Sequence, residues 1–339
     1  MYLTVTKVGI IGASGYTGLE LIKLVLAHPH FELSYVATSE GNIKLSELHP
    51  ALLDVHECDV VKADSATAAA QSDLVFLALP HKTAMEYVKE LMKTKVKVVD
   101  LSADYRLEKE RYEAHYCEHT DASNLPNAVY GLPELHREAI QKAQLVANPG
   151  CYPTSAILGI LPFVKYIKAG SDIIVDAKSG VSGAGKKCSD STHYVSINDN
   201  LFSYNPLGHR HGPEIFEKVS LKTDKDFKVQ FVPHLVPTTR GMLASVYLQL
   251  DSEVDAVALL QEYYKDEKMV RVRSNPVDMK SVAGTNFCDV FVKQSGNFLF
   301  ISSAIDNLLR GASSQAIANA NLMCGYEEVL GLPTLAYVP

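Results

Sequence analysis

The sequence of 339 residues lacks several features that would place it in common classes of protein. No apolar stretch approaches the roughly 20 residues that a membrane-spanning helix needs. Basic residues do not cluster, since the longest basic run is Lys186–Lys187 and the formal net charge is −7. A nucleic-acid-binding face would need such a cluster. We therefore expect neither membrane insertion nor nucleic-acid binding.

The six cysteines also lack the pattern of a disulfide framework. They are scattered along the chain, at positions 58, 117, 151, 188, 288 and 324, without a Cys-x-x-Cys pair. Residues 1–7 lack the charged start and apolar stretch of a signal peptide. Because free thiols are typical of reducing compartments, we expect a cytoplasmic protein.

The first half of the chain alternates apolar strands with helical patterns. Strands are expected at residues 7–11, 32–37, 74–79, 97–101 and 145–147, and helices at residues 19–26 and 83–92. Such alternation is typical of a parallel sheet that is covered on both faces by helices. The fold class that we predict for this half is α/β, with a doubly wound parallel sheet.

The second half has a different pattern. Strands are expected at residues 172–177, 244–250, 287–292 and 298–303, and the last two are joined by a hairpin turn at residues 294–297. This predicts a second domain, of the α+β class, with a mixed or antiparallel sheet. The length of the chain suits two domains. The helical segment from residue 305 onward could pack between the two domains or return to the first.

Cys151 is the strongest candidate for chemistry. Pro149 and Gly150 predict a turn, and Pro153 suits the first turn of a helix, so Cys151 is expected at a helix N-terminus. There the positive end of the helix dipole favours the thiolate, which is a strong nucleophile. The alternative is a buried structural cysteine.

A glycine-rich turn after the first strand predicts a dinucleotide site. Gly12, Gly15 and Gly18 open the first helix, where a bare backbone can approach a pyrophosphate. The spacing GxxGxxG departs from the usual GxGxxG, and a simple tight turn is the alternative.

The end of the second strand indicates which dinucleotide binds. Sites for NAD usually carry Asp or Glu there, whereas this chain has Thr38 and Ser39, followed by Glu40. Hydroxyl groups can donate to a 2′-phosphate that a carboxylate would repel. We therefore predict NADP(H) as the cofactor.

Residues 208–214 bring together acid–base groups. His209 and His211 would face the same side of an extended segment, and a histidine can move a proton near neutral pH. With Glu214 as a third ligand the same spacing could hold zinc, although no further ligand set supports a metal. A structural role for both histidines is the other alternative.

Two further features could bind anions. The glycine-rich residues 179–186 could form a nest of backbone N–H groups or a flexible surface loop. Arg106 and Arg240 could clamp a carboxylate or a phosphate, or form ordinary surface ion pairs.

Taken in order, these motifs resemble the N-acetyl-gamma-glutamyl-phosphate reductases, relatives of aspartate-semialdehyde dehydrogenase. The resemblance spans the chain and rests on residues 12–21, 79–81, 100–107, 130–134, 148–154, 179–185, 209–215, 233–237 and 306–308. It implies an NADPH-dependent acyl-phosphate reductase, a phosphorylating semialdehyde dehydrogenase of arginine biosynthesis, that acts on a small-molecule acyl phosphate. It also implies that residues 1–150, completed by a helical segment at 305–339, form a Rossmann-type NADP-binding domain, and that residues 151–304 form an α+β catalytic domain. The protein would be a homodimer or homotetramer.

The resemblance also implies roles for individual residues. Cys151 would be the nucleophile that forms a thioester, and His209, or else His211, the acid/base group. Cofactor contacts would come from Gly12, Ala13, Ser14, Gly15, Tyr16, Thr17, Gly18, Thr38, Ser39, Ser182, Gly183 and Asn307. Substrate contacts would come from Arg106, Asn148, Ser182, Glu214 and Arg240.

Three alternatives stay open at this point. A reductase for the aminoadipyl phosphate homologue, which is one carbon longer, would share most of the motifs. A cysteine hydrolase would leave the glycine turn unexplained. A non-catalytic NADP-binding regulatory protein would leave Cys151 and the two histidines unexplained.

Overall fold

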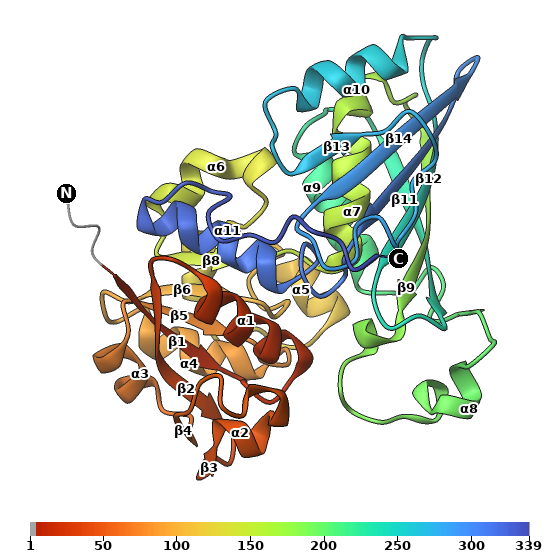
Figure 1. Ribbon diagram of the computed structural model, residues 1–339. Helices are drawn as coiled ribbons and strands as arrows, with labels where there is room; N and C mark the ends of the chain where they lie inside the picture. Colours follow the sequence, from red (N-terminus) through yellow and green to blue (C-terminus); the bar gives the residue numbers. More distant parts are fainter. Residues whose placement is uncertain (1–4, 339) are drawn as a thin grey trace. The chain divides into compact units, whose positions relative to one another are not determined.

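The computed structural model describes residues 5–338, which divide into two compact units (Figure 1). Unit 1 holds residues 5–149 and 312–332, and unit 2 holds residues 150–311 and 333–338. The sequence-based division assigns residues 305–339 to the first domain, whereas residues 305–311 and 333–338 lie in unit 2. Within residues 5–338 no helix is long and apolar enough to cross a membrane.

Unit 1 is built on an eight-stranded sheet in the order β3-β4-β2-β1-β5-β6-β8-β7. Its strands are β1 (Thr6–Ile11), β2 (Phe31–Thr38), β3 (Ile43–Lys44), β4 (Asp59–Lys62), β5 (Leu74–Leu77), β6 (Lys97–Asp100), β7 (Ala128–Tyr130) and β8 (Leu145–Ala147). Every pair is parallel except β3 with β4. The expected parallel sheet is confirmed, and its central strands are apolar because helices bury both of their faces.

The helices of unit 1 cover this sheet. They are α1 (Tyr16–Ala27), α2 (Leu45–Leu48), α3 (Ser65–Gln71), α4 (Thr83–Leu91), α5 (Lys109–His115), α6 (Pro133–Lys142) and α11 (Ser313–Cys324), with 3-10 turns η1 (Pro50–Leu52) and η2 (Ala122–Asn127). Helix α4 buries Met85, Val88 and Leu91, which share one helical face, in the core. Helix α11 packs against α1 and α6 (Figure 1).

Unit 2 is built on a seven-stranded mixed sheet in the order β10-β11-β9-β12-β15-β14-β13. Its strands are β9 (Ser171–Gly180), β10 (Phe202–Ser203), β11 (Phe227–Val236), β12 (Met242–Gln249), β13 (Val270–Val272), β14 (Cys288–Ser295) and β15 (Phe298–Ile305). Two pairs are parallel, β9 with β11 and β13 with β14. The expected hairpin is confirmed, since β14 turns into β15 through Gly296 at φ +55°.

The helices of unit 2 lie mainly on one face of its sheet (Figure 1). They are α7 (Cys151–Ile160), α8 (Tyr194–Ile197), α9 (His211–Ser220) and α10 (Ala256–Tyr264), with 3-10 turns η3 (Leu161–Tyr166), η4 (Val181–Ala184) and η5 (Asp190–Thr192). Helix α7 packs on β12 and β15, where the Ser155 and Ser303 hydroxyl oxygens are 2.9 Å apart. Because side chains alternate along a strand, Phe298 and Phe300 lie on the opposite face.

The helix expected from residue 305 onward starts later. Residues 306–312 form turns, and α11 begins at Ser313. The cause is Asp306, a fully buried residue whose Oδ1 accepts hydrogen bonds from the N–H groups of Leu308, at 2.8 Å, and Leu309, at 3.1 Å. Such bonds to nearby backbone compete with helix formation.

Candidate active site

Helix α7 begins at Cys151, as predicted. Gly150 is its N-cap, and Pro153 occupies the first turn, where its missing N–H leaves no helical bond unmade. The Cys151 side chain is half-buried. Gly311 lies against it, because a Cβ at Gly311 would come within 2.7 Å of the Cys151 Cβ. A glycine is therefore required at position 311 for the turn to approach the thiol.

Glu214 secures the start of α7. This residue on α9 is 1% exposed, and its Oε1 accepts a hydrogen bond of 3.0 Å from the N–H of Gly150. The N–H of an N-cap residue lies outside the helical ladder, so a carboxylate from α9 supplies its partner. Glu214, predicted to bind substrate, thus binds the backbone next to Cys151.

The two histidines do not lie on an extended segment, so that expectation is wrong. Arg210 between them has helical backbone angles, and His211 is the first residue of α9. This turn lets the N–H of His211 donate to Nδ1 of His209 at 3.1 Å and brings the two ring centroids to 4.8 Å. The hydrogen of a neutral His209 ring therefore belongs on Nε2.

His209 is kept neutral by its surroundings. Burial, assisted by the positive charge of Arg210, lowers the pKa of His209 from its ordinary 6.5 to about 4. Aromatic rings supply this burial, with centroids 5.9 Å (Tyr152), 5.5 Å (Tyr204) and 5.3 Å (Phe231) from that of His209.

Tyr152, which follows Cys151 in the sequence, and Tyr204 both pack against the His209 ring. Their hydroxyl oxygens are 3.1 Å apart, with Tyr204 donating. Burial raises the pKa of Tyr204 to about 12, with a smaller contribution from the negative charge of the nearby Cys151. Neither tyrosine is predicted from the sequence. The position of Tyr152 next to Cys151 is a signal for the first, whereas only the pairing of β10 with β11 places the second.

Four further predicted residues of unit 2, Ser182, Gly183, Arg240 and Asn307, lie in one region. Asn307 donates from Nδ2 to the Ser182 hydroxyl at 2.9 Å, and its Oδ1 accepts from the N–H of Gly241 at 2.8 Å. Nη1 of Arg240, next to Gly241, lies 3.5 Å from Oδ2 of Asp306. Gly183, at the centre of η4, is exposed. Asn307 thus fixes η4 beside the turn that carries Arg240.

The glycine turn of unit 1 has the shape of a dinucleotide cradle. Gly12 has φ +94°, and a Cβ there would lie 2.3 Å from the Ala78 carbonyl oxygen. A Cβ at Gly18 would lie 2.4 Å from the carbonyl oxygen of Gly12. Gly15 differs, because the nearest atom to its Cβ would be 4.0 Å away. The turn therefore leaves open space at the N-terminus of α1, which fits a pyrophosphate.

The other predicted cofactor contacts in unit 1 fall into two groups. Ser14, Tyr16 and Ser39 are exposed. The backbone oxygens of Ala13 and Thr17 accept hydrogen bonds from His49, at 2.7 Å, and Ser313, at 3.0 Å, and the Thr38 hydroxyl accepts from the N–H of Gly41 at 2.9 Å. The first group presents side chains to solvent, and the second stabilises the turns that carry them.

Arg106 and Asn148 are buried within unit 1. Arg106 is 7% exposed and donates to two backbone oxygens, from Nε to Asn148 at 2.7 Å and from Nη2 to Leu101 at 2.8 Å. Asn148 donates from Nδ2 to the Ala312 oxygen at 3.1 Å, and its Oδ1 accepts from Asn319 at 3.0 Å. Both residues therefore join the ends of β6 and β8 to the region of α11.

A buried carboxyl group lies beside Arg106. Asp100 at the end of β6 is fully buried, and its oxygens accept from the N–H and the hydroxyl of Ser102 at 2.9 and 2.7 Å. Burial, together with the negative charge of Asp104, raises the pKa of Asp100 from 3.8 to about 7.

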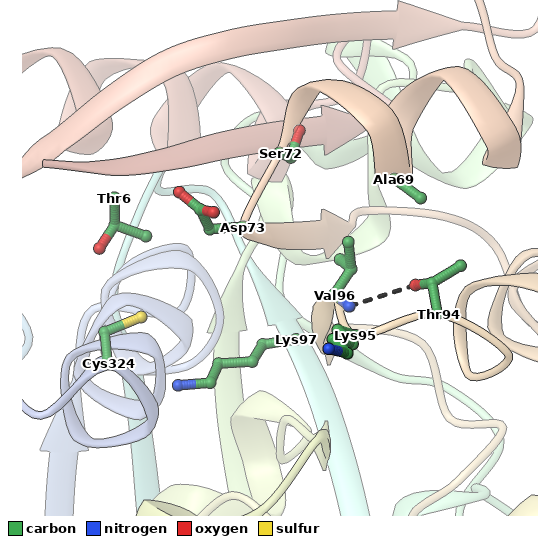
Figure 2. Close-up of a pocket in the computed structure, with 9 residues that line it drawn as sticks. All are labelled: Thr6, Ala69, Ser72, Asp73, Thr94, Lys95, Val96, Lys97 and Cys324. Atoms are coloured by element: carbon green, nitrogen blue, oxygen red, sulfur yellow. Dashed lines mark hydrogen bonds between the residues drawn. The ribbon is translucent and has the colours of Figure 1, made fainter.

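A separate cavity of about 470 Å³ lies at the amino ends of the strands of the unit 1 sheet, away from the glycine turn (Figure 2). Thr6, Asp73 and Lys97 line it at the amino ends of β1, β5 and β6, and Cys324 lines it at the end of α11. Ligands of parallel α/β sheets bind at the carboxyl ends of the strands, where the glycine turn lies. None of the predicted site residues lines this cavity.

Among residues 5–338, no group of three or more His, Cys, Asp or Glu side chains is arranged to hold a metal ion.

Comparison with known proteins gives a consistent result. Residues 7–143 match the family described as "Semialdehyde dehydrogenase, NAD binding domain", and residues 151–307 match "Semialdehyde dehydrogenase, dimerisation domain". A relative from Sulfurimonas denitrificans, named N-acetyl-gamma-glutamyl-phosphate reductase, is 63% identical over 99% of this chain and 100% of its own length. A relative of the same name from Wolinella succinogenes is 58% identical over 98% of each chain.

Solved structures share the fold. Aspartate-semialdehyde dehydrogenase II from Vibrio cholerae, complexed with ASA, has a TM-score of 0.72 at 16% identity, covering 94% of this chain and 98% of that one. Aspartate-semialdehyde dehydrogenase from Candida albicans, solved with NADP, has a TM-score of 0.72 at 14% identity over 95% and 99%. The chain therefore belongs to the semialdehyde dehydrogenase family, in the group of its N-acetyl-gamma-glutamyl-phosphate reductase relatives.

Proposed function

We propose that this enzyme catalyses the NADPH-dependent reductive dephosphorylation of N-acetyl-L-glutamyl 5-phosphate to N-acetyl-L-glutamate 5-semialdehyde. The observation that supports the chemistry is the position of Cys151 at the start of α7, together with a neutral His209 whose ring packs against those of Tyr152 and Tyr204. The names of relatives 54–63% identical to this chain support the substrate.

Cys151 carries out the first step. Its thiolate attacks the acyl carbon, the carbon–sulfur bond forms, and inorganic phosphate leaves with the electron pair of the carbon–oxygen bond that breaks. Negative charge develops on the acyl oxygen during this attack. The first N–H groups of α7 lack helical partners and are suited to stabilise that charge.

When bound, NADPH supplies the hydride that reduces the resulting thioester. His209 acts on the same oxygen, because its Nε2–H can donate to the oxyanion while Nδ1 is occupied by the His211 N–H. The oxyanion then collapses, the carbon–sulfur bond breaks, and the aldehyde leaves as the Cys151 thiolate re-forms. Glu214 acts indirectly, since it holds the Gly150 N–H at the start of α7.

The glycine turn and the end of β2 would hold the cofactor. Gly15 leaves space for the pyrophosphate at the N-terminus of α1. The exposed hydroxyl of Ser39, beside Thr38, suits the 2′-phosphate of NADP. Ser182, Gly183 and Asn307 would contact the nicotinamide side, and Arg240 an anionic group of the substrate. A lower KM for NADH than for NADPH would contradict this assignment.

Absorbance at the nicotinamide band tests the reaction in both directions. Semialdehyde, NADP and phosphate together should increase the absorbance, and omission of phosphate should abolish the change. The aminoadipyl homologue, which is one methylene longer, is the comparison substrate. One methylene changes kcat/KM by only about 10–200-fold, so both substrates have to be measured. Turnover with neither chain length would refute the proposal, and a higher kcat/KM for the longer substrate would reassign it.

We also propose that the enzyme is a cytoplasmic homodimer or homotetramer. The match to a dimerisation domain supports association. So does the sheet face of unit 2 that points away from α7, where Ile174 and Phe298 are 44% and 45% exposed and Tyr247 packs against Phe300 at 5.4 Å. Light scattering after size exclusion should give a multiple of 37.1 kDa, and Phe298→Asp should reduce it. A monomeric wild type would contradict the proposal.

A further inference from the structure

Residues 333–338, here called the strap, cross unit 2 and are tied to it by backbone hydrogen bonds. The N–H of Asn286 donates to the Pro333 oxygen, and the N–H of Tyr337 donates to the Ala283 oxygen, both at 2.8 Å. Between these two anchors lies Gly284, with φ +86°, and a Cβ there would come within 2.8 Å of the Tyr337 ring. A glycine at 284 thus lets the ring of Tyr337 lie directly on the backbone.

The same ring lies beside Arg240. The Arg240 Cζ is 5.9 Å from the centroid of the Tyr337 ring, within the range of a cation–π contact. Oδ2 of Asp306 lies 3.5 Å from Nη1 of Arg240 and accepts from the N–H of Gly284 at 2.8 Å. Gly284 therefore leaves room for the ring on one side of the guanidinium and donates its N–H to the carboxylate on the other.

Arg240 is connected to the nucleophile through one short turn. The backbone oxygen of Asp306 accepts from the N–H of Gly311 at 2.9 Å, and Gly311 is the residue that packs on Cys151. The Arg240 side chain is 18% exposed, so part of it is accessible to a ligand. A planar guanidinium recognises a carboxylate or phosphate only in a suitable orientation.

We propose that the strap orients Arg240 for an anionic group of the substrate and that Tyr337 is the positioning residue. The ring covers one side of the guanidinium while Asp306 holds one end, and the orientation is thereby fixed before the substrate binds. The inference rests on the proposed function, because it needs an anionic substrate beside Cys151. Tyr337 is then a determinant of substrate affinity, although it lies about 30 residues beyond Asp306 in the sequence.

Steady-state kinetics in the direction of aldehyde oxidation test the strap. Tyr337→Ala should raise KM by about 3- to 10-fold and leave kcat within about 2-fold, since the ring acts on binding alone. Tyr337→Phe keeps the ring and should behave like the wild type. Tyr263→Ala removes a tyrosine that is 42% exposed on α10 and is the matched control. Varying aldehyde and phosphate separately identifies which anion Arg240 holds, because only one KM should rise.

The remaining outcomes separate the strap from the proposed function. If Arg240→Ala raises KM and Tyr337→Ala does not, the strap is refuted and the reductase stands. If Tyr337→Phe is as impaired as Tyr337→Ala, or if kcat and thermal stability fall together with affinity, a positioning role for the ring is refuted. Calorimetric binding of N-acetylglutamate and of inorganic phosphate needs no turnover, and it should rank the variants in the same order. An inactive wild type that still shows this ranking would refute the reductase and leave the strap in place.

Discussion

The candidate site of unit 1 is formed by backbone, whereas the candidate site of unit 2 is formed by side chains. In unit 1 the cradle is backbone, and its defining feature is the absence of side chains at Gly12, Gly15 and Gly18. In unit 2 the site is a set of side chains that α7, α9, the β10 segment and the turn after β15 bring together. A backbone site needs certain residues at fixed local spacing, whereas a side-chain site needs the completed tertiary fold.

Burial acts on ionisable groups in both units and favours the neutral form in each. It raises the pKa of Asp100 in unit 1 to about 7 and lowers the pKa of His209 in unit 2 to about 4. The directions are opposite because burial penalises whichever form is charged. At neutral pH the consequence also differs, since His209 is fully neutral while Asp100 is near its midpoint.

The largest effect should come from the thiol of unit 2. Cys151→Ser should reduce kcat by at least about 10³-fold, because a serine hydroxyl is a far weaker nucleophile than a thiolate. Binding of NADPH, for which Cys151 is not one of the proposed contacts, should be unchanged in calorimetry. Substantial turnover by this variant would remove the nucleophile assignment, and a loss of NADPH affinity would show that the two sites are not separable.

His209 should give the next largest effect. His209→Asn should lower kcat by about 10²-fold, a typical value for a single acid–base or oxyanion group, with a smaller loss for His211→Asn. The wild-type rate should show no limb near pH 6.5 from His209, because burial lowers its pKa to about 4. A limb near 6.5 that disappears in His209→Asn would contradict the neutral imidazole.

His209 should also make the stability of the folded protein depend on pH. The unfolded histidine gains a proton near 6.5 and the native one near 4. The native state is therefore favoured above pH 6.5, and this contribution is lost as the pH falls toward 4. His209→Asn should make the thermal midpoint less sensitive to pH over that interval.

The sequence predicts the features that depend on neighbouring residues, and it does not predict those that depend on the completed tertiary fold. Buried apolar strands such as β5 and β6 and the turn before Cys151 are local signals, and the structure confirms them. The helix predicted from residue 305 begins only at Ser313, because the Asp306 carboxylate accepts hydrogen bonds from the N–H groups of Leu308 and Leu309. Tyr204 could not be predicted, since only the pairing of Phe202 with Leu235 places it near His209.

The glycines of unit 1 allow cofactor binding and folding to be separated. Gly15 has φ −79° and open space around its Cβ position, so Gly15→Ala should fold normally. Its methyl group would occupy the pyrophosphate space, and KM for NADPH should rise by about 10-fold at unchanged melting temperature.

Gly18→Ala is the matched control for that variant. Its Cβ would lie 2.4 Å from the Gly12 oxygen, and we expect a loss of about 1–3 kcal/mol in the free energy of unfolding. Equal effects of the two substitutions on thermal stability would show that the space at Gly15 is not open.

The smallest effect should come from Asp100, through the pH dependence of stability. Native Asp100 keeps its proton up to about pH 7, whereas the unfolded carboxyl loses it near 3.8. Its contribution to stability therefore decreases as the pH rises from about 4 to about 7. Asp100→Asn cannot ionise and should flatten the fall of the melting temperature between pH 5 and pH 8, while Asp172→Asn, at an exposed position, should not. An unchanged slope in Asp100→Asn would mean that Asp100 is ionised throughout this interval. Burial would then favour the neutral form of His209 but not that of Asp100.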